Sequence, residues 1–461
     1  MYKRRYLLVC CILLMSRLCE AQVSLSLKQA IDSGTARYES IRAKLQYVKA
    51  AEAQVEQARK DMLPNLVVSA QQVYGTVNGQ NGPGYGLGGY GVSSSGLPLP
   101  EQNWRSAFGA LYLANINWDV FTFGRNKQRI STANAQLSRD QADLQQELFQ
   151  HQVRVTAAYL NLLAAQQLTR SQQFNLDRAD TFRQVVVRKA VNGLVAGVDS
   201  SLANAEVSNA RTALILARDA EQERANQLAF LIGSGETSFI LDTVMVSRQP
   251  DITRAAGGSQ HPVLAFYQRR ADLGLSQAKL INASKFPALT VFGVIQTRGS
   301  GFSHLYINDQ TQFSHNYFDG IKPTRSNYLL GMGFFWNLTS VLRVNQQVHA
   351  QQAITAAQQH EYQLAADQLN AQQQLAETKL INALANFNET PVQVKAATDA
   401  YLQKSVLYKN GLTTIIDVTQ TLYTLNRAET NRDIAFNNVW QALLLKAAAA
   451  GDLGIFLNQL Q

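Results

Sequence analysis

The fold of this 461-residue chain is decided around the stretch NWDVFTFGR, residues 117–125. The segment that leads into this stretch, from Trp104 to Val120, alternates along its length and predicts a β-strand. The segment that follows, from Arg125 to Val191, lacks proline and predicts one helix of about 67 residues, or roughly 100 Å. Apolar residues at coiled-coil spacing run along this helix: Leu137, Leu144, Leu148, Val155, Tyr159 and Leu162.

The same pattern returns in the second half of the chain. Four features recur at one constant offset of 218 residues. They are a Trp (118 and 336), an Arg (125 and 343), an Asn-Gly-Leu turn (192–194 and 410–412) and an Asp (199 and 417). This offset predicts two structural repeats, residues 22–260 and 261–461, each ordered helix, strand, loop, strand, long helix, glycine turn, helix.

The remaining elements of the two repeats follow from the same kind of pattern. The first repeat predicts an opening helix, a first strand and a returning helix: Leu27–Lys60, Leu66–Val77 and Asp199–Leu231. The second repeat predicts strands at Thr290–Thr297 and Asn327–Asn337. The two shorter helices of a repeat, stacked end to end, match the length of the long helix.

Residues 1–21 have the features of a secretory signal peptide. A basic start at residues 3–5 precedes a short apolar run, Leu7–Met15, and Ala21 ends a small-residue cleavage site. An uncleaved anchor and lipidation at Cys19 remain alternatives. All three cysteines lie in this segment, so the mature chain contains no thiol for disulfides, catalysis or metal binding. The mature chain keeps 38 basic and 32 acidic residues, and its net charge of +6 shows no cluster typical of nucleic-acid binding.

A role in a membrane would have to be played by the strands, because no apolar run of eighteen residues follows the signal. The strands of the first repeat are long enough to cross a bilayer at a tilt. Trp118 and Phe121, with Trp336 in the second repeat, predict an aromatic girdle at the strand ends. Soluble hairpins with core aromatics are the alternative. Four strands cannot close a barrel, so a membrane role requires association of two or three copies.

The two glycine turns and the aspartates behind them are the main candidate site. Gly193 and Gly411 predict left-handed turns that join two helices. Asp199 and Asp417 follow six residues later, at the start of the returning helices. Such an aspartate either favours a helix N-terminus or, repeated around a symmetry axis, forms a carboxylate ring that attracts cations.

The sequence contains no recognisable catalytic constellation. There is no HExxH, P-loop or nucleophile-elbow motif, and none of the six histidines stands at metal-ligand spacing. We therefore expect no catalytic residues, no metal and no cofactor. An exported enzyme is the function class that the sequence supports least.

Taken together, these motifs resemble the outer-membrane efflux protein family, whose members are TolC-like outer-membrane factors. The resemblance rests on residues 117–125, on both glycine turns and on the run from Tyr408 to Val418, and it covers nearly the whole mature chain. It implies a mostly α chain with a small β part. Internally duplicated helical hairpins form an α-barrel, and four transmembrane strands per chain form a twelve-stranded barrel in a homotrimer. The implied location is the outer membrane, with the helices in the periplasm.

The resemblance also implies partners and roles for the turns. A periplasmic adaptor protein would meet the helical tips at Gly193, Leu194, Gly411 and Leu412, and an inner-membrane pump would supply energy. Acidic residues near the tip narrow the periplasmic entrance in this family, and Asp417 falls on one such position, with Asp199 as its counterpart. The family pattern places a second acid where Gln420 stands and a base where Thr413 stands, so we expect a weaker ionic network here.

The expected function is therefore a passive exit duct of a tripartite efflux system, which exports small molecules such as drugs. Type I protein secretion and metal efflux are alternative uses of the same duct. A soluble periplasmic coiled-coil scaffold is the alternative from a different class. The sequence names neither the cargo nor the particular pump and adaptor.

Overall fold

The computed structural model describes residues 24–79, 97–242, 245, 250 and 260–459. The predicted signal peptide, residues 1–21, lies outside this range. The chain divides into two compact units, each made from separated parts of the sequence. The helical unit comprises Met1–Ala50, Leu137–Ala271 and Ala356–Gln461, and the strand unit comprises Ala51–Gln136 and Asp272–Thr355.

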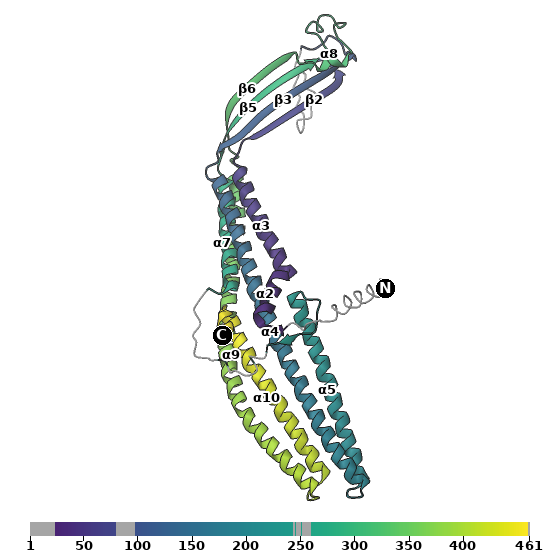
Figure 1. Ribbon diagram of the computed structural model, residues 1–461. Helices are drawn as coiled ribbons and strands as arrows, with labels where there is room; N and C mark the ends of the chain where they lie inside the picture. The colour runs from purple at the N-terminus through teal and green to yellow at the C-terminus, as the bar shows by residue number, and fades with distance from the viewer. Residues whose placement is uncertain (1–23, 80–96, 243–244, 246–249, 251–259, 460–461) are drawn as a thin grey trace, which may run out of the picture. The chain divides into compact units, whose positions relative to one another are not determined.

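The strand unit contains one antiparallel four-stranded sheet, shown as a single curved layer in Figure 1. Its order is β2 (Asn65–Thr76), β3 (Ser106–Phe121), β5 (Ala288–Ser300) and β6 (Arg325–Phe335). The central pairing of β3 with β5 therefore joins the two halves of the sequence. A short helix, α8 (Tyr317–Ile321), lies in the connection between β5 and β6.

The helical unit is built from long helices, several of which continue into the strand unit. Residues 125–191 form α4 (Arg125–Val191), and residues 340–409 form α9 (Ser340–Lys409). The glycine turns connect these helices to α5 (Gly197–Ile232) and α10 (Ile415–Ala450). The remaining elements are α2 (Leu27–Arg37), α3 (Glu39–Lys60), α7 (Pro262–Ala283), α11 (Gly454–Leu457) and the parallel pair β1 (Ser24–Leu25) and β4 (Ile240–Leu241).

The predicted fold class, mostly helical with a small β part, is confirmed, and α4 has the predicted bounds. No helix among the described residues is both long enough and apolar enough to span a bilayer. Trp336, expected inside the last strand, lies one residue beyond β6. The division into repeats at residues 260 and 261 stays a prediction, because both compact units draw on both repeats.

The single helix predicted for residues 27–60 is wrong, because the chain breaks at Tyr38. Tyr38 has extended backbone (φ −71°, ψ 119°) between α2 and α3. Its ring stacks on the buried ring of His151 in α4, with the two centroids 3.9 Å apart. The break therefore accompanies a tertiary contact between residues that are 113 positions apart in the chain. Local helix propensity carries no information about such a contact.

The decisive stretch 117–125 is a strand-to-helix junction with unusual backbone angles. Phe123 and Gly124 both have positive φ, 51° and 91°, and turn the chain from β3 into α4. The Thr122 hydroxyl accepts a hydrogen bond from the Asn126 amide at 3.2 Å, in the first turn of α4. Arg125 pairs with Asp119 at 3.2 Å across the same junction.

The core of the helical unit centres on Trp440, which is 1% exposed. Its indole N–H donates to the Met245 carbonyl at 3.1 Å, so the buried polar atom is satisfied. Tyr159 is equally buried, and its hydroxyl donates to the Leu25 carbonyl and accepts from the Asp242 amide. Burial raises the pKa of Tyr159 to about 12. These bonds tie the β1 and β4 strands to α4.

Helix α9 continues through Pro391, which lacks the amide hydrogen that would bond the Phe387 carbonyl. The hydroxyl of Thr390, the preceding residue, donates to that carbonyl at 2.8 Å instead. Thr390 is 2% exposed, so this bond replaces the missing backbone donor in a buried place. The Thr390 hydroxyl thus takes the place of the missing Pro391 amide, which explains how a 70-residue helix accommodates a proline.

Candidate functional site

The two glycine turns have the same hydrogen-bonding geometry. Gly193 and Gly411 have φ of 72° and 75°, the left-handed conformation predicted for them. The following leucines close each turn, since the amide of Leu194 bonds the Lys189 carbonyl and that of Leu412 bonds the Leu407 carbonyl, both at 2.9 Å. This is the Schellman arrangement that ends α4 and α9. Each turn thus presents a leucine side chain that is about 70% exposed.

Lys189 links the first turn to the second. Its ammonium group donates to the carbonyls of Tyr408 and Lys409, at 2.8 and 2.7 Å, which are among the last carbonyls of α9. The Tyr408 carbonyl also accepts the Gly411 amide of the turn at 3.1 Å. The negative end of the helix dipole favours a cation beside these last carbonyls. The ammonium group also lies 5.1 Å from the centre of the Tyr408 ring.

Asp199 also takes part in the contact between the two turns. Its carboxylate accepts a hydrogen bond from the Tyr408 hydroxyl at 3.4 Å. Burial, reinforced by the nearby Asp199 charge, raises the pKa of Tyr408 to about 12. The Tyr408 side chain also packs in an apolar cluster made of Phe182, Val186, Ala203, Ile415 and Val418. The two turns, 218 residues apart in sequence, are therefore side by side (Figure 1).

Asp417 lies in the first turn of α10 and has its own partners. The Thr413 hydroxyl donates to its carboxylate at 2.5 Å, and Lys404 approaches it at 3.5 Å. The hydrogen bond from Thr413 holds the pKa of Asp417 below its usual value, and the Lys404 charge adds to this effect. The Asp417 amide in turn donates to the N-cap hydroxyl of Thr414. Asp417 is therefore both part of the helix start and an ionised group at the turn.

The structure thus brings together most of the predicted turn residues and adds others. Gln420 is exposed one turn further along α10. Sequence reasoning missed Lys189, Tyr408 and Lys404. A cation in the last turn of a helix that ends in a glycine turn was the available signal for Lys189. No local signal identified Tyr408 as its partner.

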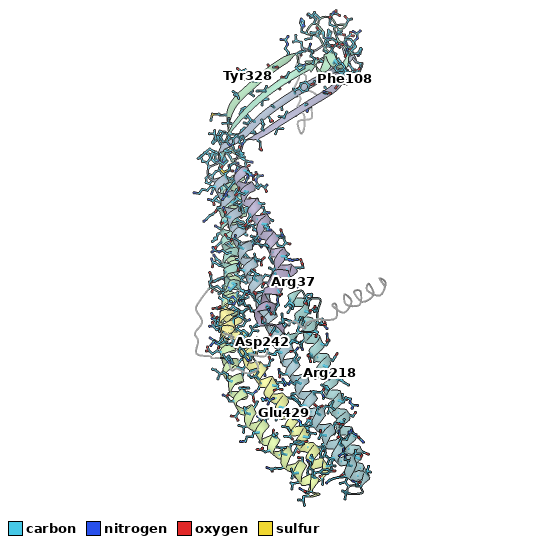
Figure 2. All side chains as sticks on the ribbon, viewed as in Figure 1. Arg37, Phe108, Arg218, Asp242, Tyr328 and Glu429 are labelled. Atoms are coloured by element: carbon cyan, nitrogen blue, oxygen red, sulfur yellow. The ribbon has the colours of Figure 1, made fainter. Side chains whose placement is uncertain are left out.

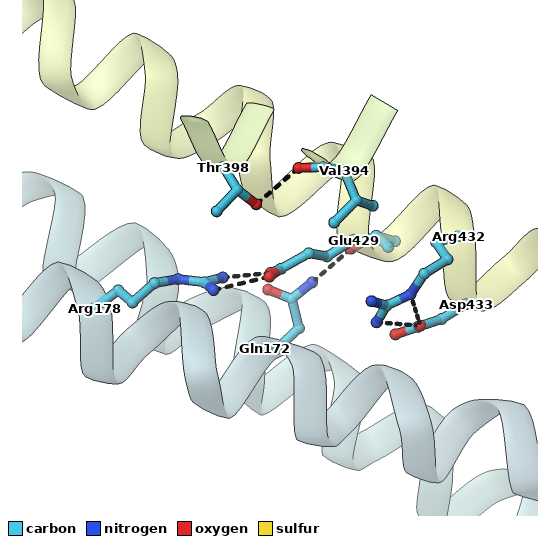
Figure 3. A network of polar contacts seen from close by, with 8 residues as sticks. Gln172, Arg178, Val394, Thr398, Glu429, Arg432 and Asp433 are labelled. Carbon is cyan, nitrogen blue, oxygen red and sulfur yellow. Dashed lines mark hydrogen bonds and ion pairs between the residues drawn. The ribbon is translucent and has the colours of Figure 1, made fainter. Parts of the chain in front are cut away.

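A second link joins the α4–α5 hairpin to the α9–α10 hairpin further along the helices (Figure 3). The guanidinium group of Arg178 in α4 donates to both carboxylate oxygens of Glu429 in α10. The Gln172 amide donates to the Thr430 hydroxyl at 3.4 Å beside this pair. The Arg178 and Glu429 side chains are 26% and 19% exposed, so water screens their attraction only in part.

The two faces of the sheet in the strand unit differ in chemistry. Because strand residues alternate and directly paired residues share a face, the register assigns each side chain to one face. One face is mostly apolar along all four strands, and its polar residues Gln72, Thr297 and Ser326 lie toward the loop-connected end. Its apolar residues include Leu66, Val68, Ala114, Ile116, Val291, Ile295, Tyr328, Leu330, Met332 and Phe334. The other face carries the polar residues Asn115, Asn117, Asp119, Thr290, Gln296 and Asn327 among apolar ones. On the apolar face Tyr328 is 80% exposed (Figure 2).

The predicted girdle tryptophans make equivalent contacts at the helix-connected end of the sheet. The indole N–H of Trp118 donates to the Met62 carbonyl at 2.9 Å, and that of Trp336 donates to the Lys285 carbonyl at 3.0 Å. Both rings stay about half exposed, as does Phe121, which packs against Phe123. An aromatic ring with a satisfied polar tip and an exposed apolar body suits a membrane interface.

A second aromatic group lies at the loop end of the apolar face and was missed from the sequence. Phe108, labelled in Figure 2, contacts Tyr74 on β2. Its ring also meets that of Tyr317 in α8 edge-on, with the centroids 5.2 Å apart. The apolar face is therefore bounded by aromatic residues at both ends, which is the pattern of an outer-membrane strand.

A two-faced antiparallel sheet joined to long helical hairpins is typical of outer-membrane channels. The model of a known family, outer membrane efflux protein, matches residues 30–234. No curated protein matches the sequence of this chain.

Solved structures share the fold over nearly the whole chain. CusC, a transmembrane channel, has a TM-score of 0.76 at 13% identity, with 93% of each chain covered. VceC, an outer membrane protein of Vibrio cholerae, has a TM-score of 0.71 at 17% identity, with 92% of this chain and 96% of VceC covered. The CmeC outer membrane channel of Campylobacter jejuni has a TM-score of 0.72 at 11% identity, with 92% of this chain and 85% of CmeC covered.

These comparisons confirm the predicted resemblance to the outer membrane efflux protein family, in sequence over residues 30–234 and in fold over more than nine tenths of the chain. The matching family and the solved structures that share the fold are outer-membrane channels, as the sequence predicted. The family consists of outer-membrane channels and not of enzymes.

Proposed function

We propose that this protein is the passive outer-membrane exit duct of a tripartite efflux system for small molecules such as drugs. The observation that carries the proposal is the two-faced sheet: an exposed apolar face bounded by aromatics, backed by a face with polar residues. A strand layer of this kind suits contact with lipid on one side and with water on the other. The chain itself performs no chemistry in this proposal and binds no metal or cofactor.

The sheet supports a homotrimer. Among the described residues its edge strands, β2 and β6, each pair on one side only. Unpaired backbone groups are not tolerated in lipid, so these edges need partners. Pairing β2 of one subunit with β6 of the next closes a ring, and three copies make the twelve-stranded barrel that the family resemblance implies. The mature chain then consists of the two repeats, 22–260 and 261–461, after removal of residues 1–21.

The helical turns support the proposed partners. Leu194 and Leu412 are strongly exposed apolar side chains, and the backbone of each is held by the hydrogen bonds of its own turn. Exposed apolar side chains on rigid turns are suitable anchors for another protein. We propose that they and the glycines before them contact the periplasmic adaptor. An inner-membrane pump provides the energy, and outer-membrane lipid covers the apolar face.

The entrance of the duct is assigned to the aspartates of the turns. Three copies of Asp417, with Asp199 and the polar side chains of Thr413 and Gln420 nearby, line the periplasmic opening in this proposal. The Thr413 hydrogen bond keeps Asp417 ionised, which favours cations over anions. Closure of the entrance rests on the links from Lys189 to α9 and from Arg178 to Glu429.

Fractionation and planar-bilayer recording test the proposal together. The protein is expected in outer-membrane fractions as a heat-modifiable trimer that conducts ions in bilayers. The Asp417→Asn variant is expected to conduct with reduced preference for cations. Release without detergent as a monomer that forms no channels would contradict the proposal and favour the periplasmic scaffold.

The cargo class needs a separate measurement. A deletion strain is expected to become more sensitive to several unrelated small toxic compounds, and the plasmid-borne gene is expected to restore resistance. Sensitivity limited to a metal salt, or loss of a secreted protein, would replace drug efflux by metal efflux or type I secretion.

A further inference from the structure

A pair of arginines stands opposite one another where β5 and β6 approach their connecting loop. Arg298 and Arg325 are direct partners in the register of the two strands, and both are exposed. Like charges placed directly opposite on neighbouring strands repel each other and destabilise a sheet. A guanidinium group stays charged at every physiological pH, so this repulsion cannot be relieved by proton loss.

The backbone fixes the two arginines in this position. The carbonyl of Arg298 accepts two hydrogen bonds from Thr324, from its amide at 2.8 Å and from its hydroxyl at 3.1 Å. On the opposite face, the hydroxyls of Thr297 and Ser326 lie 3.1 Å apart and hold the next register pair. These hydrogen bonds therefore fix the register that places the two arginines opposite each other.

The pair lies on the face with the polar residues. Alternation along β5 and β6 places it on the same face as Gln296 and Asn327, the register pair two residues away. An arginine on a lipid-facing strand surface is destabilising, which agrees with this assignment. In the proposed trimer, this face lines the water-filled passage.

The connecting loop covers the other face and leaves the arginines open. A side chain on Gly299 would meet the carbonyl oxygens of Gly320 and Lys322 at 2.7 Å, so the α8 segment packs directly against that position. The Tyr112 hydroxyl donates to the Ile321 carbonyl at 3.2 Å from the same side. Neighbouring strand residues point to opposite faces, so the α8 segment does not cover the Arg298 side chain.

Within the described residues, neither arginine forms an ion pair with a carboxylate. Asp119, on the same face, lies eight residues along β5 from Arg298, or roughly 26 Å, and is bonded to Thr290 and Arg125. The loop acids Asp309 and Asp319 are held by hydrogen bonds from side chains of the loop itself. Residues 80–96 of the other loop contain no Asp or Glu in their sequence.

We propose that Arg298 and Arg325 form an anion-attracting ring at the outer mouth of the duct, which concentrates anionic molecules such as organic carboxylates and phosphates at the exit, whereas the proposed Asp417 ring acts at the periplasmic entrance. The inference rests on the proposed trimeric duct, in which three copies supply six guanidinium groups. Each guanidinium group can donate two parallel hydrogen bonds to the paired oxygens of a carboxylate or phosphate. The strand ends joined by loops, and not those joined to helices, face the cell exterior in this arrangement.

Reversal potentials across planar bilayers under a KCl gradient test the ring. The full-length protein and the R298Q/R325Q variant are compared at about 0.1 M salt, where the Debye length is about 10 Å. We expect the ratio of K⁺ to Cl⁻ permeability to rise about threefold in the variant, and the difference to shrink at 1 M salt because screening is stronger. The matched control K322Q, which removes a charge from the α8 side, is expected to leave the ratio unchanged.

Two further measurements test the arginine ring even if the R298Q/R325Q variant fails to assemble. R298K/R325K retains the charge and is expected to keep the wild-type ratio. Inositol hexakisphosphate, a polyanion, serves as a probe of block in the wild-type channel. The concentration that blocks from the loop side is expected to be at least tenfold lower than the concentration that blocks from the other side. A ratio unaltered in R298Q/R325Q, or equal block from both sides, would overturn the ring. Absence of any wild-type channel would instead reject the proposed duct itself.

Discussion

Replacing Glu429 by Gln tests how firmly the α4–α5 hairpin is held to the α9–α10 hairpin. Glu429 accepts from both terminal nitrogens of Arg178, and the two side chains come from helices in different halves of the sequence. The amide of Gln fills the same volume without the charge. The substitution therefore leaves Arg178 partly buried and without its counter-ion, while the packing of the helices is kept.

The expected cost follows from the exposure of the pair. An exposed ion pair contributes about 0–1 kcal/mol, whereas breaking a fully buried pair costs about 3–5 kcal/mol. With side chains 26% and 19% exposed, the pair lies between these limits. Hydrogen bonds to charged groups contribute about 1.5–3 kcal/mol each, so we expect a loss of about 2 kcal/mol for Glu429→Gln.

A double-mutant cycle measures this energy. Arg178→Gln, Glu429→Gln and the double variant are unfolded in urea, with the helical circular dichroism signal as readout, at equal protein and detergent concentrations. The pairwise coupling is expected to be about 1.5 kcal/mol or more. The control Glu56→Gln breaks an exposed pair with Arg59 and is expected to cost no more than about 0.5 kcal/mol. A coupling no larger than the effect of that control would refute the reasoning.

Three further predictions concern the turns and the core. Thr413→Val removes the hydrogen bond that lowers the pKa of Asp417. The cation preference is lost as pH falls through that pKa, so in bilayer recordings the variant is expected to lose it at a higher pH than the wild type. An unshifted midpoint of the pH dependence would contradict this. Lys189→Met removes two hydrogen bonds to the end of α9 and is expected to speed amide exchange at residues 410–412, and unchanged rates would count against the link. Trp440→Ala empties a site that is 1% exposed and is expected to cost about 3–5 kcal/mol, seen as a lower thermal midpoint; an unaltered midpoint would show that the core is elsewhere.

Features encoded locally could be predicted from the sequence. The bounds of α4 follow from an uninterrupted helical pattern between the junction at Gly124 and the turn at Gly193. The left-handed turns follow from glycine itself, since no other residue adopts that conformation so readily. The strands followed from alternation, although their ends shifted by one to three residues.

Features that depend on distant partners could not be predicted in the same way. The break at Tyr38 accompanies stacking on His151, and the end of α9 is capped by Lys189 from the other hairpin. The arginine pair becomes visible only when the register of β5 and β6 is known. The roles of Asp417, Gln420 and the exposed leucines stay predictions, because they concern subunits and partners outside a single chain.

Ring closure between subunits tests the central claim most directly. Residues 22–461 contain no cysteine, so the proposed removal of residues 1–21 leaves only thiols that are introduced. One cysteine is placed at Val68 on β2, and a second is placed in turn at one of four positions on β6: Tyr328, Leu330, Met332 or Phe334. At one of these β6 positions, oxidation in the outer membrane is expected to give a covalent trimer on a denaturing gel, with each single-cysteine variant staying a monomer. A series that yields no species larger than a monomer at any position would contradict the account of three subunits sharing one closed sheet.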